Sequence, residues 1–378
     1  MRHRSAELAS RLSTFVSQVR ASQISETGSS GIPSDISTVR EEWYREPSAK
    51  DVADGCFDDP DVNYEEAPRG INWLPDEIDR VVKPKTTIAF VGASGSGKTV
   101  MALDLLLRHR RYYSYGLAVC STDDGIAKLS RIIPCCLVVR ELTLDLYRAF
   151  LEFGRSLVAE CGGDEDLAPA GFLFGDDVGF NRELFNSKEM KEACSAGRHF
   201  NQGYYWLVQY HIDLPPFVRK QAKSVFVFRT NADNAIQFYF REYFAVVGKD
   251  WWFDNPKAGT KGLFNQATGQ RRALVYIRNE DSNAIEDTVF VHMVRDPDWV
   301  MASGKRMCVP FLWWLNDLFY YNRGEQKMAK FRSGLMQRRV QALTQRNSTQ
   351  AITDSGGAPR WTARGAAGPD RRSKHRRR

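Results

Sequence analysis

The chain lacks the features of membrane-spanning, secreted and zinc- or disulfide-framed proteins. No uninterrupted apolar run approaches the roughly 18 residues that a spanning helix needs, so we expect no membrane span. The basic N-terminus, residues 1–5, is not followed by the apolar segment of a secretory signal. The seven cysteines include no C-x-x-C pair, which favours reduced thiols in a cytosol-like compartment. No internal repeat of roughly 20 to 50 residues is present.

Charge is distributed unevenly along the 378 residues, whose formal net charge is +7. Residues 331–378 carry 12 Lys and Arg against two Asp, a net charge of +10, and residues 1–330 therefore sum to −3. Residues 41–66 carry ten Asp and Glu against two basic residues, a net charge of −8. A basic tail is typical of proteins that bind nucleic acid, although a solubilising or localisation tail has the same composition.

The strongest motif is GASGSGKT at residues 92–99, which fits the phosphate-loop (Walker A) pattern G-x-x-x-x-G-K-[ST]. A β-rich apolar run precedes it and a run of good helix formers follows it, so the glycines fall at a strand-to-helix turn. There, backbone N–H groups can hold phosphate oxygens. Lys98 is expected to reach the β- and γ-phosphates, and Thr99 to bind Mg²⁺. The predicted nucleotide-binding residues are Gly92, Ala93, Ser94, Gly95, Ser96, Gly97, Lys98 and Thr99.

From residue 86 onward strand patterns alternate with helical patterns, which predicts an α/β fold with a central, mostly parallel sheet flanked by helices. Strands are expected at residues 86–91, 117–121, 135–139, 171–175, 204–208 and 224–228, and a hairpin at the sheet edge from residues 273–278 and 289–294. Helices are expected at residues 100–107, around 146–157, from an Asn186 cap to about Gly197, and within 311–346.

These patterns divide the chain into four parts. Residues 1–70 are interpreted as a weakly ordered arm with an acidic stretch and one short helix at residues 8–19. Residues 71–305 form the phosphate-loop domain, residues 306–346 a C-terminal helical segment, and residues 347–378 a disordered basic tail.

A second nucleotide signal is the apolar strand GFLFGDD at residues 171–177, which ends in paired acids. Asp176 is positioned as a Walker B carboxylate that holds Mg²⁺, and Asp177 is placed to orient or deprotonate an attacking water. Strands also end in Asp-Asp turns without any function, but the position of this pair after a phosphate loop favours a nucleotide site. Gln209 closes the strand at residues 204–208, where it either touches the γ-phosphate or the water or simply caps the strand.

The order of motifs resembles the HerA/FtsK superfamily of hexameric DNA pumps, and within it the poxvirus-type virion-packaging ATPases of large DNA viruses. The motifs are GASGSGKT, FLFGDD, GRHF, YYWLVQY and LPPFVRKQAKSVFVFR, and the resemblance covers about residues 86–294. The phosphate loop indicates only an NTPase, whereas the combination between Asp176 and Arg229 is the specific part. Gly175 departs from the family, because a larger apolar residue is usual there, and it predicts slightly weaker packing.

The resemblance implies roles for residues that the pattern alone leaves open. It makes Gln209 the polar sensor and Arg198 the best arginine-finger candidate, supplied to the site of a neighbouring subunit, with Arg219 and Arg229 as runners-up. His199 is expected to pack against the helix end rather than act in catalysis. It further implies a P-loop NTPase fold with a RecA-like central sheet, and ATP and Mg²⁺ as substrate and cofactor. The implied partners are double-stranded DNA, capsid or portal-like proteins and further copies of the chain in a homo-oligomeric ring (hexamer or pentamer). The implied location is the virion and the host-cell cytoplasm.

Other functions have less support in the sequence. No N-K-x-D guanine-specificity motif follows Asp176, and no Arg-rich kinase lid is found. A RecA-type recombinase, which also carries a Gln on a comparable strand, is less cleanly excluded. A cellular DNA pump of the same superfamily and a non-catalytic nucleotide-binding virion protein stay open as alternatives. The intact Lys98, Thr99, Asp176 and Asp177 argue against the latter.

Overall fold

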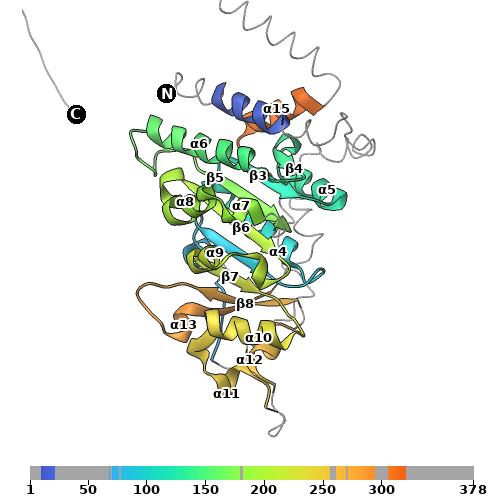
Figure 1. The fold of residues 1–378 in the computed structure, drawn as a ribbon, viewed down its shortest axis with the longest axis vertical. Helices are drawn as coiled ribbons and strands as arrows, with labels where there is room; N and C mark the ends of the chain where they lie inside the picture. Colours follow the sequence, from blue (N-terminus) through green and yellow to red (C-terminus); the bar gives the residue numbers. More distant parts are fainter. Residues whose placement is uncertain are drawn as a thin grey trace, which may run out of the picture. The chain divides into compact units, whose positions relative to one another are not determined.

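The computed structural model describes residues 10–21, 68, 70–75, 78–178, 182–255, 261–269, 271–293 and 305–320. Its strands are β1 (Asn72–Trp73), β2 (Thr87–Val91), β3 (Tyr115–Cys120), β4 (Val138–Val139), β5 (Gly171–Asp176), β6 (Gln202–Val208), β7 (Ser224–Val227), β8 (Arg272–Ile277) and β9 (Val289–Met293). They form one sheet in the order β1-β9-β8-β7-β2-β6-β5-β3-β4, which Figure 1 shows from β4 near the top to β8 below. The expected α/β architecture with a RecA-like, mostly parallel sheet is confirmed.

Helices follow the strands along the chain and cover the sheet. The longer ones are α4 (Lys98–Arg108), α5 (Asp123–Ile132), α6 (Leu144–Glu160), α8 (Lys188–Ala196) and α15 (Pro310–Tyr320). The shorter helices are α3 (Ile78–Val81), α7 (Arg182–Asn186), α9 (Pro216–Gln221), α10 (Asp233–Tyr239), α11 (Lys249–Trp252), α12 (Leu263–Ala267) and α13 (Ile285–Thr288). Helices α8 and α9 lie on the face of the sheet turned toward the viewer in Figure 1. Short helical turns also occur, among them η3 (His109–Tyr112), η4 (Cys135–Leu137), η6 (Gly197–Phe200) and η7 (His211–Asp213).

The central strands are parallel, and this brings their carboxyl ends to one edge of the sheet. β2 pairs in parallel with β6 and β7, and β5 pairs in parallel with β3 and β6. All five residues of β2 and all seven of β6 are buried, as expected for strands covered on both faces. Ligands of open parallel sheets bind outside the carboxyl ends of the strands. The phosphate loop follows β2, Asp176 is the last residue of β5, and Gln209 follows β6, so all three lie at this edge of the sheet.

Two strand expectations need correction. The hairpin of β8 and β9 is antiparallel as expected, but it is not outermost, because β1 pairs in parallel with β9 beyond it. The strand expected at residues 135–139 is reduced to the two residues of β4, and residues 135–137 form η4 instead. The reason is that the backbone N–H of Cys136 donates to Asn316 Oδ1 on α15, at 3.0 Å, instead of joining a sheet ladder.

The start of α8 also differs from the sequence prediction. Its cap is Ser187 and not Asn186, because the Ser187 hydroxyl accepts a hydrogen bond from the backbone N–H of Met190 at 3.1 Å. Serine is among the best capping residues, so the helix is still capped by a polar side chain, one residue later than predicted.

A helix at residues 10–21 packs into the core, close to the helix predicted at residues 8–19. Phe15 stacks on Phe153 with ring centroids 4.9 Å apart and meets the ring of Tyr115 edge-on at 6.3 Å. Leu12, Val16 and Val19 are also buried. This part of the N-terminal region is therefore integral to the fold. The acidic stretch at residues 41–66, Cys56 and the basic residues 331–378 lie outside the described residues.

Replacing Phe15 with alanine is expected to lower the free energy of unfolding by about 3 to 5 kcal/mol, because the change leaves a cavity between aromatic rings. Equilibrium denaturation in urea measures this. Gln18→Ala, on the exposed side of the same helix, is the control and should change stability by less than about 0.5 kcal/mol. Equal, small effects of the two substitutions would show that the helix does not contribute to the core.

Two further findings apply only to the described part of the chain. There, no helix has the length and apolar character needed to cross a membrane. The six cysteines in the described ranges are all free thiols.

Candidate nucleotide site

The phosphate loop connects β2 to α4 with backbone conformations that require glycine. Gly97, which directly precedes α4, has a φ of 94°, in the left-handed region that side chains disfavour. At Gly92 space is limiting, because an added Cβ would lie 2.6 Å from the Cβ of Phe228, the residue after β7. Ser96 Oγ is buried and has no hydrogen-bond partner in the described structure, so it is available to a ligand. The loop therefore fits a phosphate group.

Lys98 is held against this loop by the backbone. Its Nζ donates to the carbonyl oxygens of Gly92 at 2.6 Å and Ala93 at 2.9 Å, and the residue is only 8% exposed. Burial lowers the pKa of Lys98, and the charges of Asp176 and Asp177 oppose this shift. An incoming polyphosphate would bring further negative charge to the lysine and favour its charged form.

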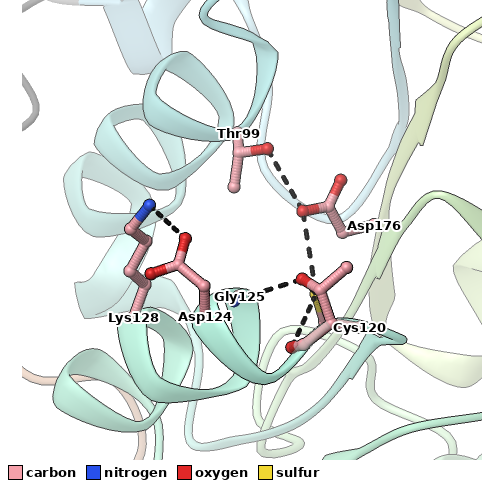
Figure 2. Close-up of polar contacts among 7 residues, drawn as sticks. Thr99, Cys120, Asp124, Gly125, Lys128 and Asp176 are labelled. Atoms are coloured by element: carbon pink, nitrogen blue, oxygen red, sulfur yellow. Dashed lines mark hydrogen bonds and ion pairs between the residues drawn. The ribbon is translucent and has the colours of Figure 1, made fainter. Parts of the chain in front are cut away.

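Thr99 and Asp176 form a pair of oxygen donors across the site. Thr99 Oγ1, in the first turn of α4, donates to Asp176 Oδ2 at the end of β5 at 3.1 Å (Figure 2). Burial raises the pKa of Asp176, and the Thr99 hydrogen bond and the Lys98 charge oppose this. Within the described ranges no group of three or more His, Cys, Asp or Glu could hold a metal. A site with one carboxylate and one hydroxyl suits Mg²⁺, which usually keeps several of its waters.

Asp177 and Gln209 form a second pair beside the first. Asp177 has a φ of 57°, and its backbone N–H donates to Leu207 O at 3.0 Å, which turns the chain at the end of β5. Gln209 Nε2, just beyond β6, donates to Asp177 Oδ2 at 2.8 Å. The structure thus places Lys98, Thr99, Asp176, Asp177 and Gln209 at one edge, as the sequence suggested. Their catalytic roles stay predictions.

The candidate arginine fingers differ in what they contact. Arg198 lies in η6, but its side chain is outside the described part of the structure. Arg219 makes its contacts within its own chain: its Nη1 donates to the carbonyl oxygens of His211 and Leu214, and its guanidinium lies over the ring of Phe238, 5.0 Å from the centroid. These contacts hold Arg219 within its own subunit.

Arg229 and His199 have more exposed positions. Arg229 follows β7 by two residues, and its charge contributes to lowering the pKa of Asp254, after hydrogen bonds from Asn265 and the Gly262 backbone. His199 is not packed against the helix end as expected. Its side chain is 77% exposed, and its Nδ1 lies 3.2 Å from Glu165 Oε1.

Sequence reasoning missed Cys120, at the end of β3. Its thiol points toward Asp176 Oδ2 at 4.0 Å and lies 3.5 Å from Thr122 Oγ1 (Figure 2). Thr122 in turn caps α5 by accepting from the backbone N–H of Gly125 at 3.2 Å. The sequence carries no signal for this contact, because it is the register between β3 and β5 that brings Cys120 opposite Asp176.

The packing penalty expected at Gly175 is also absent. Gly175 is in register with Trp206 on β6, and an added Cβ would lie 2.9 Å from the indole ring. Trp206 is fully buried and fills the space that a larger residue would take.

No protein family model matches the sequence. The chain is 28% identical over 209 residues to uncharacterized protein 075L of Invertebrate iridescent virus 6, covering 55% of this chain and 76% of that protein. It is 24% identical over 164 residues to uncharacterized protein 015R of Frog virus 3 (isolate Goorha), covering 43% of this chain and 50% of that protein.

Among solved structures, the genome packaging NTPase B204 from Sulfolobus turreted icosahedral virus 2, in complex with ATP-gammaS, is similar with a TM-score of 0.38. The identity is 18%, and the match covers 56% of this chain and 100% of that one. EssC (ATPases 2 and 3) from Geobacillus thermodenitrificans is similar with a TM-score of 0.39 at 12% identity, over 60% of this chain and 46% of that one. These names describe those proteins.

Proposed function

We propose that this chain is a Mg²⁺-dependent ATP hydrolase that translocates double-stranded DNA and packages a viral genome into a capsid. The observation that carries the hydrolase part is the pair of hydrogen bonds, Thr99 to Asp176 and Gln209 to Asp177, formed beside the phosphate loop. They join residues 77 and 32 positions apart in the chain. In the proposal, Thr99 and Asp176 are the metal ligands, and Asp177 and Gln209 orient the attacking water.

Each residue has a distinct task in the proposed reaction. The loop N–H groups and Lys98 bind the β- and γ-phosphates, and Lys98 offsets charge that develops on the γ-phosphate. Mg²⁺, when bound by Thr99 and Asp176, supplies further neutralisation of the phosphate charge. Asp177 accepts the proton of the attacking water, and Gln209, hydrogen-bonded to Asp177, holds that water in line.

The DNA and viral parts of the proposal are supported by three observations. The motif order from Asp176 to Arg229 resembles the virion-packaging ATPases. The similar proteins 075L and 015R belong to viruses. The basic residues 331–378 suit a polyanion. The proposal includes a hexameric or pentameric ring with sites at subunit interfaces, a capsid or portal-like partner, and a location in the virion and host-cell cytoplasm.

The test of this function is the ATP hydrolysis rate with and without long duplex DNA, on full-length protein whose oligomeric state has been measured. We expect hydrolysis by an oligomer and a higher rate when DNA is present. Hydrolysis that does not respond to DNA would contradict the translocase. A complete lack of hydrolysis by the oligomer would instead favour the non-catalytic nucleotide-binding protein.

A mixing experiment tests whether Arg198 acts on a neighbouring subunit. Arg198→Ala and Lys98→Ala chains, each nearly inactive alone, are expected to regain partial turnover when mixed, because some interfaces then combine an intact loop with an intact finger. Arg219→Ala, which loses contacts within its own subunit, is the comparison and should give no such rescue with Lys98→Ala. If the Arg198→Ala mixture stays inactive, Arg198 does not act in trans.

A further inference from the structure

A cluster of cations lies at the amino-terminal edge of the central strands, opposite the nucleotide site. Lys83 and Lys85 precede β2, and Arg110 and Arg111 lie in η3, which follows α4. Lys83, Arg110 and Arg111 are exposed and Lys85 is half-buried. Among the described residues none of these four forms an ion pair. We refer to the four residues as the basic edge.

A buried hydrogen-bond cluster joins the two segments that carry the basic edge. The backbone N–H of Lys85 donates to the hydroxyl of Tyr113 at 2.9 Å, and the Tyr113 hydroxyl lies 3.1 Å from that of Tyr205 on β6. His109 Nδ1 lies 2.7 Å from the same Tyr205 hydroxyl. All three side chains are buried. The two segments are therefore fixed side by side, and their cations are presented on an ordered base.

Cations on adjacent segments repel one another, and this repulsion is relieved when a polyanion binds. Arginine and lysine side chains are the usual donors to nucleic-acid phosphates, and tyrosine hydroxyls also contribute. Tyr112, which follows Arg111 directly, is 37% exposed. Among the described residues the other large exposed apolar side chains are Leu167, Tyr210, Ile212 and Val246, on other elements. The basic edge thus offers positive charge, with little apolar surface for a peptide.

We propose that the basic edge binds the phosphate backbone of duplex DNA without reading its sequence. The inference rests on the proposed function, because it names the surface on which the translocated DNA would be held. α4 begins at Lys98 in the nucleotide site and ends at Arg108, close to Arg110, after 11 residues or about 16 Å of helix. The buried helix α4 would therefore connect the phosphate loop, at its first residue, with a DNA contact at the basic edge, near its last residue.

The experiment compares two full-length double variants that each lose two positive charges. Arg110→Gln/Arg111→Gln removes half of the basic edge, and Arg241→Gln/Lys249→Gln removes two exposed cations from the helical region near α10 and α11. Binding to labelled duplex DNA is measured by fluorescence anisotropy over a range of KCl concentrations. The slope of log affinity against log salt is negative, and each phosphate contact makes it steeper by about 0.9. The slope of Arg110→Gln/Arg111→Gln should therefore be shallower than that of wild type by up to about 1.8. The slope of Arg241→Gln/Lys249→Gln should equal that of wild type. ATP hydrolysis without DNA should be unchanged in both.

Lys83→Gln provides a second variant on the other segment, in case the arginine substitutions disturb η3. We expect it to make the salt slope shallower by up to about 0.9. Equal slopes for wild type and both basic-edge variants would overturn the inference. So would a loss of polyglutamate binding in these variants with DNA binding retained, because the surface would then serve an acidic polypeptide. If wild-type protein itself neither binds DNA nor responds to it, the proposed function fails, and this outcome is distinct from equal binding by the variants.

Discussion

Lys98→Ala is expected to lower the rate of ATP hydrolysis by on the order of 10³-fold, because the site loses the cation that stabilises charge on the transferred phosphate. Lys98 Nζ also bonds the carbonyl oxygens of Gly92 and Ala93, so the substitution loosens the loop and should weaken nucleotide binding. Single-turnover hydrolysis and equilibrium binding of a fluorescent ATP analogue separate the two effects.

The matched control is Lys128→Ala. Lys128 lies on α5, where it pairs with Asp124 at 2.6 Å, and its side chain is 51% exposed (Figure 2). It should hydrolyse ATP at nearly the wild-type rate. A Lys98→Ala protein that retains wild-type turnover, stimulated or not by DNA, is incompatible with the proposed chemistry.

Asp177→Asn should reduce turnover by about 10² to 10⁴-fold while nucleotide affinity stays close to wild type. The reason is that asparagine matches aspartate in size and tolerates the left-handed backbone at this position, where φ is 57°. The amide oxygen can still accept the hydrogen bond from Gln209 Nε2, so the geometry survives and only the proton acceptor is lost. Pre-steady-state hydrolysis measured beside nucleotide affinity shows whether the loss lies in the chemical step.

Asp124→Asn serves as the control for this substitution. Asp124 is an exposed acid in the first turn of α5, paired with Lys128, and removing its charge should leave hydrolysis unaffected. If Asp177→Asn retains full turnover, another group accepts the proton, and Asp177 is a structural turn residue.

Much of the central fold could be predicted because its signals are local. The run before the phosphate loop is apolar on both faces, so it had to be a buried strand, and the parallel order placed Gly92, Asp176 and Gln209 at one edge. The errors occurred where distant residues decide the outcome. Asn316 on α15 accepts a hydrogen bond from residue 136 and so decides how residues 135–137 fold. β1 pairs with β9 and so becomes the outer strand beyond the hairpin. In both cases the two contacting segments are far apart in the sequence.

The same distinction applies to the site. The acids and the lysine belong to motifs whose spacing reports their chemistry. The contact of Cys120 with Asp176 and the packing of Trp206 over Gly175 do not, because they depend on strand register across the sheet. The network of His109, Tyr113 and Tyr205 was invisible for the same reason, since these residues read as ordinary core positions in the sequence.

The two outermost strands of the sheet have a consequence for self-association. β1 and β4 are each two residues long and close opposite ends of the nine-stranded sheet. Short edge strands offer too few free backbone groups to recruit a strand from another molecule, which is how many proteins avoid edge-to-edge aggregation. Copies of this chain would therefore not join by extending the sheet. Any specific assembly would use side chains on helices and loops, and such an interface can loosen and re-form without disrupting the sheet.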